Sequence, residues 1–178
     1  MTNLLSTKIQ NRVREVVDFP SEGINFKDIT PILEDPELCG EIVKSLKDSL
    51  KDTIIDAVVG IESRGFLFGM LLASELNVPF VVVRKKGKLP WKTNSFKYDL
   101  EYGTAEVEMH LDSIKPDWKV LVHDDLLATG GTAVAASELV QMQGGQVAGF
   151  AFLIEIVDLK GRKVLEKYSK NIINLIRY

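Results

Sequence analysis

The residues best suited to chemistry lie between positions 120 and 132, where an apolar run ends in two carboxylates and a loop of small residues. The carboxylates of Asp124 and Asp125 can accept hydrogen bonds from sugar hydroxyls. A helical pattern follows the loop, and a helix start offers unpaired N–H groups that suit a phosphate. Because the carboxylates and a phosphate are all negatively charged, they must occupy different parts of the site. The pattern therefore predicts a site for a phosphorylated ribose, with the sugar hydroxyls at the carboxylates and the phosphate at the loop. The loop residues are Ala128, Thr129, Gly130, Gly131 and Thr132.

A second loop, residues 62–65, lies between a strand pattern and a helix pattern. Its N–H groups and Arg64 could hold another anion, although an ordinary strand–helix turn has the same spacing. Gly60 and Gly65 have the spacing of a nucleotide-hydrolase loop, but Phe66 replaces the required lysine. The glycines at 144–149 precede a strand, so they do not form a dinucleotide fingerprint.

A basic run and a long irregular segment follow the next strand pattern. Residues 84–88 contain four cations, which form either a solvated turn or an anion site. Residues 89–102 show no clean period and are long enough to suggest a lid that keeps water from a reactive sugar. Glu101 is the carboxylate in this segment that we expect to handle a proton, and a surface salt bridge is the alternative.

The run ending in Asp-Asp-Leu-Leu-Ala-Thr-Gly-Gly-Thr resembles the phosphoribosyl-diphosphate signature of the type I phosphoribosyltransferases. The resemblance continues, in the family's order, through residues 19–31, 60–66, 84–90 and 100–103. It implies transfer of a phosphoribosyl group from 5-phosphoribosyl 1-diphosphate to adenine, with Mg²⁺ carried by the substrate rather than by the protein. It also implies a homodimer.

The resemblance assigns roles to individual residues. It implies that Asp124 and Asp125 bind the ribose, that residues 128–132 bind its 5′-phosphate, and that Glu101 is a general acid or base near the purine N7. Arg84 is implied to reach the neighbouring subunit's site. The diphosphate residues would be Glu62, Ser63, Arg64, Gly65, Lys88 and Tyr102. The adenine residues would be Ile24, Phe26, Lys27 and Leu126.

The elements that position these residues can be predicted from hydrophobic periodicity. Residues 8–17 have helical spacing, residues 19–31 are rich in Pro and Gly, and Asp35 with Pro36 opens a second helix. From position 54, strand and helix patterns alternate, and the continuous β-branched runs indicate buried parallel strands. Expected strands lie at 54–61, 80–83, 119–122, 147–156 and 172–176, and expected helices at 66–76 and 133–142. Residues 104–111 alternate as in a half-exposed antiparallel strand.

We therefore expect an α/β fold, a parallel twisted sheet flanked by helices, with an antiparallel lid strand. The 178 residues should form a single domain, with residues 1–34 as a base-binding hood and residues 85–103 as a flexible lid. His123 is expected to be a packed or hydrogen-bonded core residue rather than a metal ligand, since His110 is the only other histidine. Cys39 is expected to be a small buried side chain.

Bulk properties limit the functional classes. A net charge of −3 argues against nonspecific nucleic-acid binding. The single cysteine, and the absence of a signal-peptide pattern at residues 1–10 or of a long apolar span, favour a cytoplasmic protein that does not bind membranes.

Two alternatives stay open. One is a phosphoribosyltransferase for another base, such as xanthine or hypoxanthine, which a substrate panel would distinguish. The other is a noncatalytic regulator that senses the sugar diphosphate. A regulator should carry a DNA-binding module or a basic RNA-facing surface, whereas only about fifty residues precede the first sheet strand.

Overall fold

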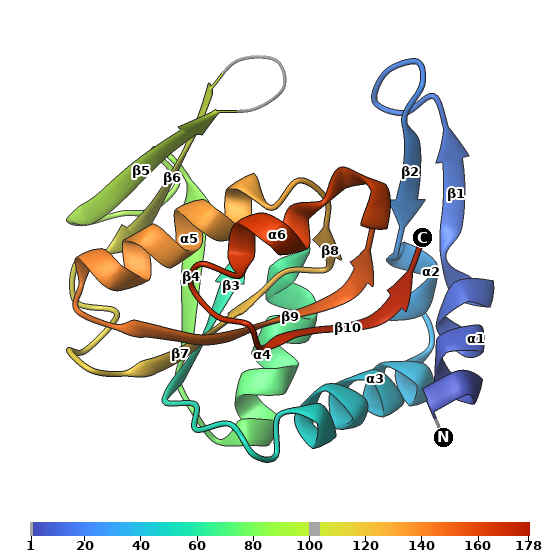
Figure 1. Cartoon of the computed structure of the whole chain (residues 1–178), viewed down its shortest axis with the longest axis horizontal. Helices are drawn as coiled ribbons and strands as arrows, with labels where there is room; N and C mark the ends of the chain where they lie inside the picture. Colours follow the sequence, from blue (N-terminus) through green and yellow to red (C-terminus); the bar gives the residue numbers. More distant parts are fainter. Residues whose placement is uncertain (1, 100–103) are drawn as a thin grey trace.

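A mixed sheet forms the centre of the molecule (Figure 1). The computed structural model describes residues 2–99 and 104–178, and within these ranges eight strands form one sheet in the order β10-β9-β7-β3-β4-β6-β5, with β8 paired to β9. The strands from β10 to β4 are parallel, whereas β6 is antiparallel to both β4 and β5. This confirms the predicted parallel sheet with an antiparallel extension. The strands are β3 (Ala57–Ile61), β4 (Phe80–Lys85), β5 (Thr93–Asp99), β6 (Thr104–His110), β7 (Lys119–His123), β8 (Leu126–Leu127), β9 (Gln146–Glu155) and β10 (Ile172–Arg177).

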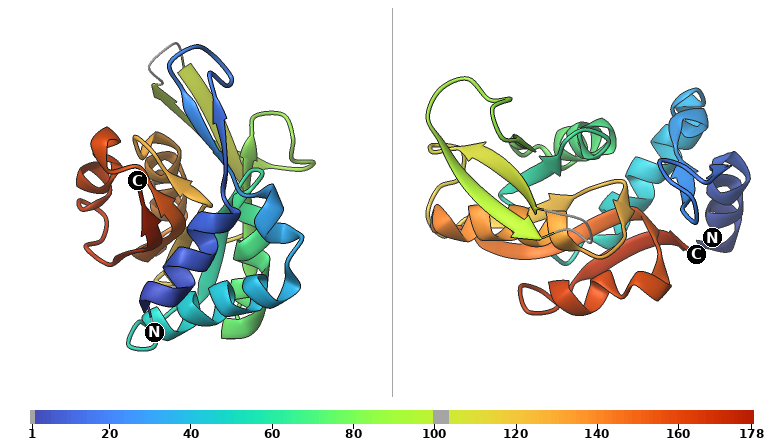
Figure 2. Two further views of the ribbon diagram at one scale, coloured as in Figure 1. Left: turned by 90° about the vertical axis from the view of Figure 1, so that its right-hand side faces the viewer. Right: turned by 90° about the horizontal axis from the view of Figure 1, so that it is seen from above.

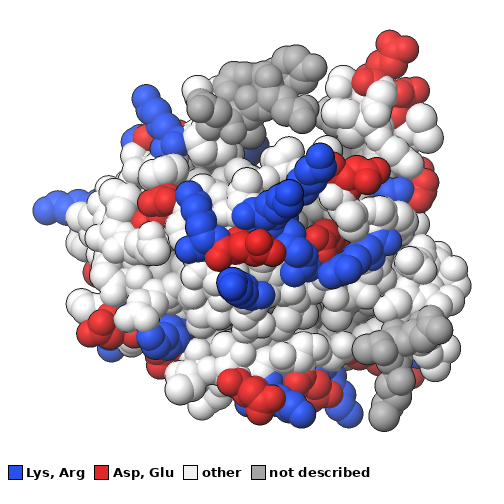
Figure 3. All heavy atoms as spheres, viewed as in Figure 1, with Lys and Arg blue, Asp and Glu red and all other residues white. Residues whose placement is uncertain are grey.

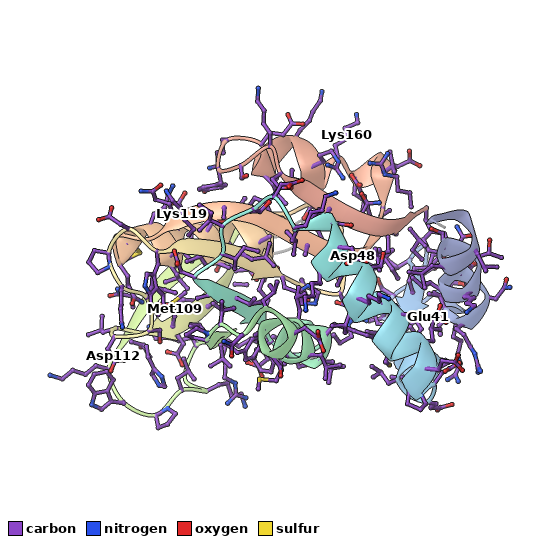
Figure 4. All side chains as sticks on the ribbon, turned by 90° about the horizontal axis from the view of Figure 1, so that it is seen from below. Glu41, Asp48, Met109, Asp112, Lys119 and Lys160 are labelled. Atoms are coloured by element: carbon purple, nitrogen blue, oxygen red, sulfur yellow. The ribbon has the colours of Figure 1, made fainter. Side chains whose placement is uncertain are left out.

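Helices cover both faces of the sheet, which explains why its central strands are apolar on both sides (Figure 2). Helices α3 (Pro36–Ser49) and α4 (Gly65–Leu76) lie on one face, with Val58 and Leu121 in their core. Helices α5 (Gly131–Met142) and α6 (Gly161–Leu165) lie on the other face, over Val59 and Val122. In the view from below, Lys160 projects from the α6 layer, whereas Glu41 and Asp48 lie on α3 (Figure 4). Successive strand residues therefore serve separate cores.

Helix α3 begins where the sequence predicts. The Asp35 side chain accepts a hydrogen bond from the Leu38 N–H at 3.0 Å, and Pro36 occupies the first helical position. Such a cap is worth about 1 kcal/mol, and proline at this position loses no helical hydrogen bond.

The N-terminal helix begins and ends earlier in the chain than predicted. Helix α1 (Thr2–Arg12) ends before Val13, and strand β1 (Arg14–Val17) follows, so the predicted helix over 8–17 is wrong in its second half. Strand β1 pairs antiparallel with β2 (Asn25–Asp28), and the short helix α2 (Thr30–Leu33) follows. The prediction of an irregular segment over 19–31 is therefore also wrong in part. The β-branched Val16 suits either structure, and the partner strand decides between them.

The β5–β6 hairpin corrects the prediction for the lid. Much of the segment predicted as a flexible lid is strand β5, in which Phe96 pairs with Val107, and Phe96 packs against the core. In β6, Val107 and Met109 are buried as predicted, but Glu108 is only 3% exposed instead of facing solvent. The polar side of β6 is therefore covered at Glu108, whereas Glu106 and His110 on the same side stay partly exposed.

Cys39 and His123 differ in part from expectation. Cys39 is half-buried, and its thiol donates to the Ile32 carbonyl oxygen. His123 is fully buried, burial lowers its pKa to about 4, and its ring nitrogens have no hydrogen-bond partner among the described residues. His123 is therefore a packed, neutral core residue.

The surface carries both charges. On the face shown in Figure 3, Lys and Arg gather over the C-terminal elements and are interleaved with acidic residues, as in the ion pairs of Glu155 with Arg162 and Arg177. Among the described helices, none is long and apolar enough to cross a membrane.

Candidate active site

Three segments with charged or small side chains meet at the carboxyl ends of the parallel strands. Residues 62–65 follow β3, residues 84–88 extend from the end of β4, and residues 124–132 follow β7. A Cβ atom added to Gly65 would lie 2.9 Å from both Asp124 Oδ1 and the His123 carbonyl oxygen, so the loop after β3 is in direct contact with the end of β7 and the loop that follows it. Ligands of open α/β sheets bind at this edge. The hairpins β1–β2 and β5–β6 stand on either side of it (Figure 1).

The loop 128–132 encloses a small cavity of about 70 Å³ at the start of α5. Gly130 has φ +85°, a left-handed conformation that glycine adopts without strain, and it places the loop directly before the helix. Among the described residues, no side chain caps the first turn of α5. Its N–H groups and the positive end of its dipole therefore face the cavity and suit a phosphate. The Tyr98 hydroxyl on β5 lies 3.2 Å from Thr132 Oγ1, so the hairpin touches this loop.

Gly161 supports the loop from behind. A Cβ at position 161 would collide with the Ala128 carbonyl oxygen and lie 3.0 Å from the Gly130 nitrogen. The two stretches of chain therefore pack backbone against backbone. Sequence analysis missed this residue, because a glycine after a strand signals only a turn.

Asp124 and Asp125 form a tightly coupled acidic pair. The Asp125 side chain is 3% exposed, and its N–H donates to Asp124 Oδ1 at 2.9 Å. Burial, together with the negative charge of Asp125, raises the pKa of Asp124 well above its usual value. Burial also raises the pKa of Asp125, although Arg64 opposes this. Two such carboxylates gain from any ligand that donates hydrogen bonds to them, as a diol does.

Arg64 links the acidic pair to the neighbouring cavity. Its Nε lies 2.9 Å from Asp125 Oδ2, a contact that is an ion pair without hydrogen-bond geometry. Its guanidinium carbon lies 4.7 Å from the ring centre of Phe26. Its Nη1 is buried and has no partner among the described residues, so donors remain for an anion.

A second cavity, of about 860 Å³, lies between the β1–β2 hairpin and the residues that follow β9. The Phe26 ring lies against Phe19 edge to face, with centres 5.2 Å apart. Every residue predicted to bind adenine lines this cavity: Ile24, Phe26, Lys27 and Leu126. Sequence analysis missed Ile156, Asp158, Leu159 and Tyr178, which also line it and carry no motif.

Lys27 contributes its charge to the wall of this cavity rather than to its centre. Its Nζ lies 2.5 Å from Glu15 Oε1 and 4.1 Å from the ring centre of Tyr178. Because the ammonium is already paired, Lys27 is not a free charge for a ligand in this cavity.

Glu62 connects the loop after β3 to the basic turn. Its carboxylate accepts hydrogen bonds from Arg84 Nη2 at 3.1 Å and from the Lys85 N–H at 2.9 Å, and its peptide bond to Ser63 is cis. Burial raises the pKa of Glu62, but these hydrogen bonds and the charges of Arg84 and Lys88 lower it overall. In this chain Arg84 is therefore bound within its own subunit. Glu101 and Tyr102 lie outside the described residues.

The comparisons with known proteins agree with one another. The sequence profile of the phosphoribosyl transferase domain matches residues 28–176. The chain is 48% identical over 175 residues to an adenine phosphoribosyltransferase of Cytophaga hutchinsonii, covering 98% of this chain and 97% of the relative. The crystal structure of the adenine phosphoribosyltransferase from Thermoanaerobacter pseudethanolicus superposes with a TM-score of 0.94 at 46% identity, covering 97% of this chain and 99% of that one. The Saccharomyces cerevisiae enzyme, complexed with an imino-altritol bisphosphate and adenine, gives a TM-score of 0.89 at 36% identity, with 98% and 99% covered.

Gly161→Ala should weaken the binding of ribose 5-phosphate at least about 10-fold, because the new methyl group displaces the Ala128 carbonyl and the loop it belongs to. Isothermal titration calorimetry measures this affinity. Gly40→Ala is the control, since a Cβ at position 40 meets nothing within 4 Å. An unchanged affinity in the Gly161 variant would contradict the steric argument.

Asp124→Asn should raise the free energy of unfolding at pH 8 while weakening the binding of ribose 5-phosphate. The folded state disfavours the ionised form of Asp124, so the cost is present above the raised pKa and disappears as the pH falls through it. A gain of about 1 kcal/mol would raise Tm by roughly 2–4 °C. Calorimetric melting at pH 8 and pH 4 checks this, with the exposed Asp112→Asn as control. A variant less stable than wild type at pH 8 would refute it.

Proposed function

The chain belongs to the phosphoribosyltransferase family, and we propose that it transfers the 5-phosphoribosyl group from 5-phosphoribosyl 1-diphosphate to adenine in purine salvage. The products are AMP and diphosphate. In this glycosyl transfer the bond from the anomeric carbon to the diphosphate oxygen breaks, a bond to adenine N9 forms with inversion, and the imidazole-ring proton of adenine is released.

One observation carries the proposal: the phosphate-sized cavity and the apolar cavity share Leu126, Ala128 and Thr129 as wall residues. A nucleotide places its phosphate and its base on either side of a ribose, and Asp124 borders the smaller cavity. Residues 128–132 would hold the 5′-phosphate, and Asp124 and Asp125 would hold the ribose hydroxyls. The adenine ring would lie between Phe26 and Leu126, with the backbone of Ile24 at its edge.

Charge stabilisation would come from cations around the leaving group. As the bond to diphosphate breaks, negative charge develops on its oxygens, and the spare donors of Arg64 together with Lys88 offset it. Ser63, Gly65 and Tyr102 complete the proposed diphosphate contacts, and Glu62 fixes the loop through Arg84.

Mg²⁺ would enter with the substrate. The described residues bring together no group of three His, Cys, Asp or Glu side chains able to hold a metal. Mg²⁺ commonly binds through substrate phosphates and waters with few protein ligands, so the diphosphate itself is its proposed carrier. The ion would neutralise charge on the leaving diphosphate. Omission of Mg²⁺ with a chelator present should abolish AMP formation.

We place the reaction in the cytoplasm and propose a homodimer. Leu67, Met70 and Leu71 on α4 are 42%, 53% and 46% exposed, an apolar helix face that a second copy would cover. Arg84 lies near this helix through Glu62, and in a dimer it would border the neighbouring site. A single-chain mass in sedimentation equilibrium would exclude the dimer.

A substrate panel tests the activity. With 5-phosphoribosyl 1-diphosphate and Mg²⁺ fixed, adenine should be preferred to hypoxanthine, guanine and xanthine by about 100-fold or more, since backbone groups can read its amine and N1. Spectrophotometric detection of nucleotide formation gives kcat/KM for each base. Robust turnover of an oxopurine but not of adenine would favour the alternative base. No turnover with any base would refute the transferase.

Glu101→Gln should slow the chemical step by about 100-fold or more, because the amide cannot move a proton at the purine. Adenine binding should change only slightly. Rapid-quench single-turnover measurement separates these effects, and Glu106→Gln, whose carboxylate contacts Lys86, is the control. A wild-type single-turnover rate would remove Glu101 from the mechanism.

A further inference from the structure

Glu108 is a buried acid that the alternating pattern of β6 assigns to solvent. It is 3% exposed, whereas Glu106, two residues earlier on the same side of the strand, pairs with the Lys86 side chain at 2.8 Å. The turn between β4 and β5 folds back over Glu108 and covers it. A buried carboxylate needs hydrogen-bond donors, so its partners reveal its role.

Two of its three partners are backbone groups at the end of the basic run, and the third is a side chain at the start of β5. Glu108 Oε1 accepts hydrogen bonds from the Lys88 N–H at 3.0 Å and the Leu89 N–H at 2.8 Å. Glu108 Oε2 accepts one from the Thr93 hydroxyl at 3.2 Å. Bonds from N–H groups to a carboxylate are stronger than those between neutral groups, so they fix the path of the turn.

The peptide groups of Lys88 are thus held from two directions. Its N–H donates to Glu108 Oε1 at 3.0 Å and, at the longer distance of 3.2 Å, to the Lys85 carbonyl oxygen, and its own carbonyl oxygen accepts from Arg84 Nη1 at 2.9 Å. Arg84 is in turn bound by Glu62, which precedes the loop 63–65. The Lys88 side chain stays exposed, and its backbone is linked through Arg84 to Glu62, the residue that precedes that loop.

We propose that Glu108 is a positioning residue, which holds the backbone of residues 88 and 89 so that the Lys88 ammonium reaches the diphosphate. This inference rests on the proposed function. An electrostatic role and a positioning role of Glu108 predict opposite changes in binding when the side chain is altered. A negative charge near the diphosphate would by itself weaken binding, so a purely electrostatic role predicts a gain when Glu108 is neutralised. A positioning role predicts a loss when its acceptor oxygen is removed.

Steady-state kinetics of Glu108 variants, with a Glu106 variant as the control, separate these possibilities. Glu108→Ala should lower kcat/KM for 5-phosphoribosyl 1-diphosphate by about 10- to 100-fold, with KM for adenine unchanged. Glu108→Gln keeps an oxygen for both N–H groups and should stay within about 3-fold of wild type. If Glu108→Ala does not fold, Glu108→Asp takes its place, since it keeps the charge but withdraws the oxygens by one methylene, and it should show a loss. Glu106→Ala should match wild type.

A double-mutant cycle with Lys88→Ala shows whether Glu108 acts through Lys88. In the Lys88→Ala background, Glu108→Ala should cause little further loss, because the side chain that it positions is already gone. Equal losses in both backgrounds would overturn the proposal, and so would wild-type kinetics in Glu108→Ala and Glu108→Asp. Failure of the proposed function would look different, because the wild-type protein itself would then form no AMP.

Discussion

The repulsion between the carboxylates of Asp124 and Asp125 determines which groups can surround them. Two adjacent carboxylates at the end of a buried strand are tolerated because cations and dipoles surround them: Arg64 pairs with Asp125, and the positive end of α5 lies a few residues further on. The backbone of Gly65 can approach Asp124 only because it lacks a side chain. Under the proposed function, the arrangement that is costly without a ligand would be complementary to a sugar phosphate, because the sugar hydroxyls would donate hydrogen bonds to the carboxylates and the phosphate would accept them from the helix N–H groups.

Much of the fold could be predicted because its central strands are buried on both faces. Every residue of β3 is buried, as its continuous run of apolar, largely β-branched residues predicts for a strand covered on both faces. Prediction failed where tertiary pairing decides the conformation. Val16 became part of a strand because residues 25–28 lie beside it, and Phe96 because β6 does. Neither partner can be read from periodicity within the segment itself.

The candidate site residues also divide into those that sequence motifs predict and those that only tertiary contacts reveal. Asp124, Gly130 and Phe26 could be predicted as site residues from their motifs, and the structure places all three in the walls of the two cavities. Gly161 and Glu108 could not, because their importance comes from atoms distant in sequence: the Ala128 carbonyl oxygen for one, the Lys88 and Leu89 N–H groups for the other. In an alternating strand pattern, the sequence does not distinguish a buried glutamate from a surface glutamate, because the residues that cover it lie in another segment of the chain.

The β1–β2 hairpin forms a two-stranded sheet of its own, apart from the sheet that holds the phosphate loop. Ile24 and Phe26 belong to this hairpin. Leu126 instead lies in the segment that continues into the loop at 128–132, and it lines both cavities. Under the proposed function, substitutions in the hairpin would change one wall of the base cavity and leave the loop at 128–132 untouched. Laboratory selections for activity with unnatural bases should therefore begin with the residues of this hairpin.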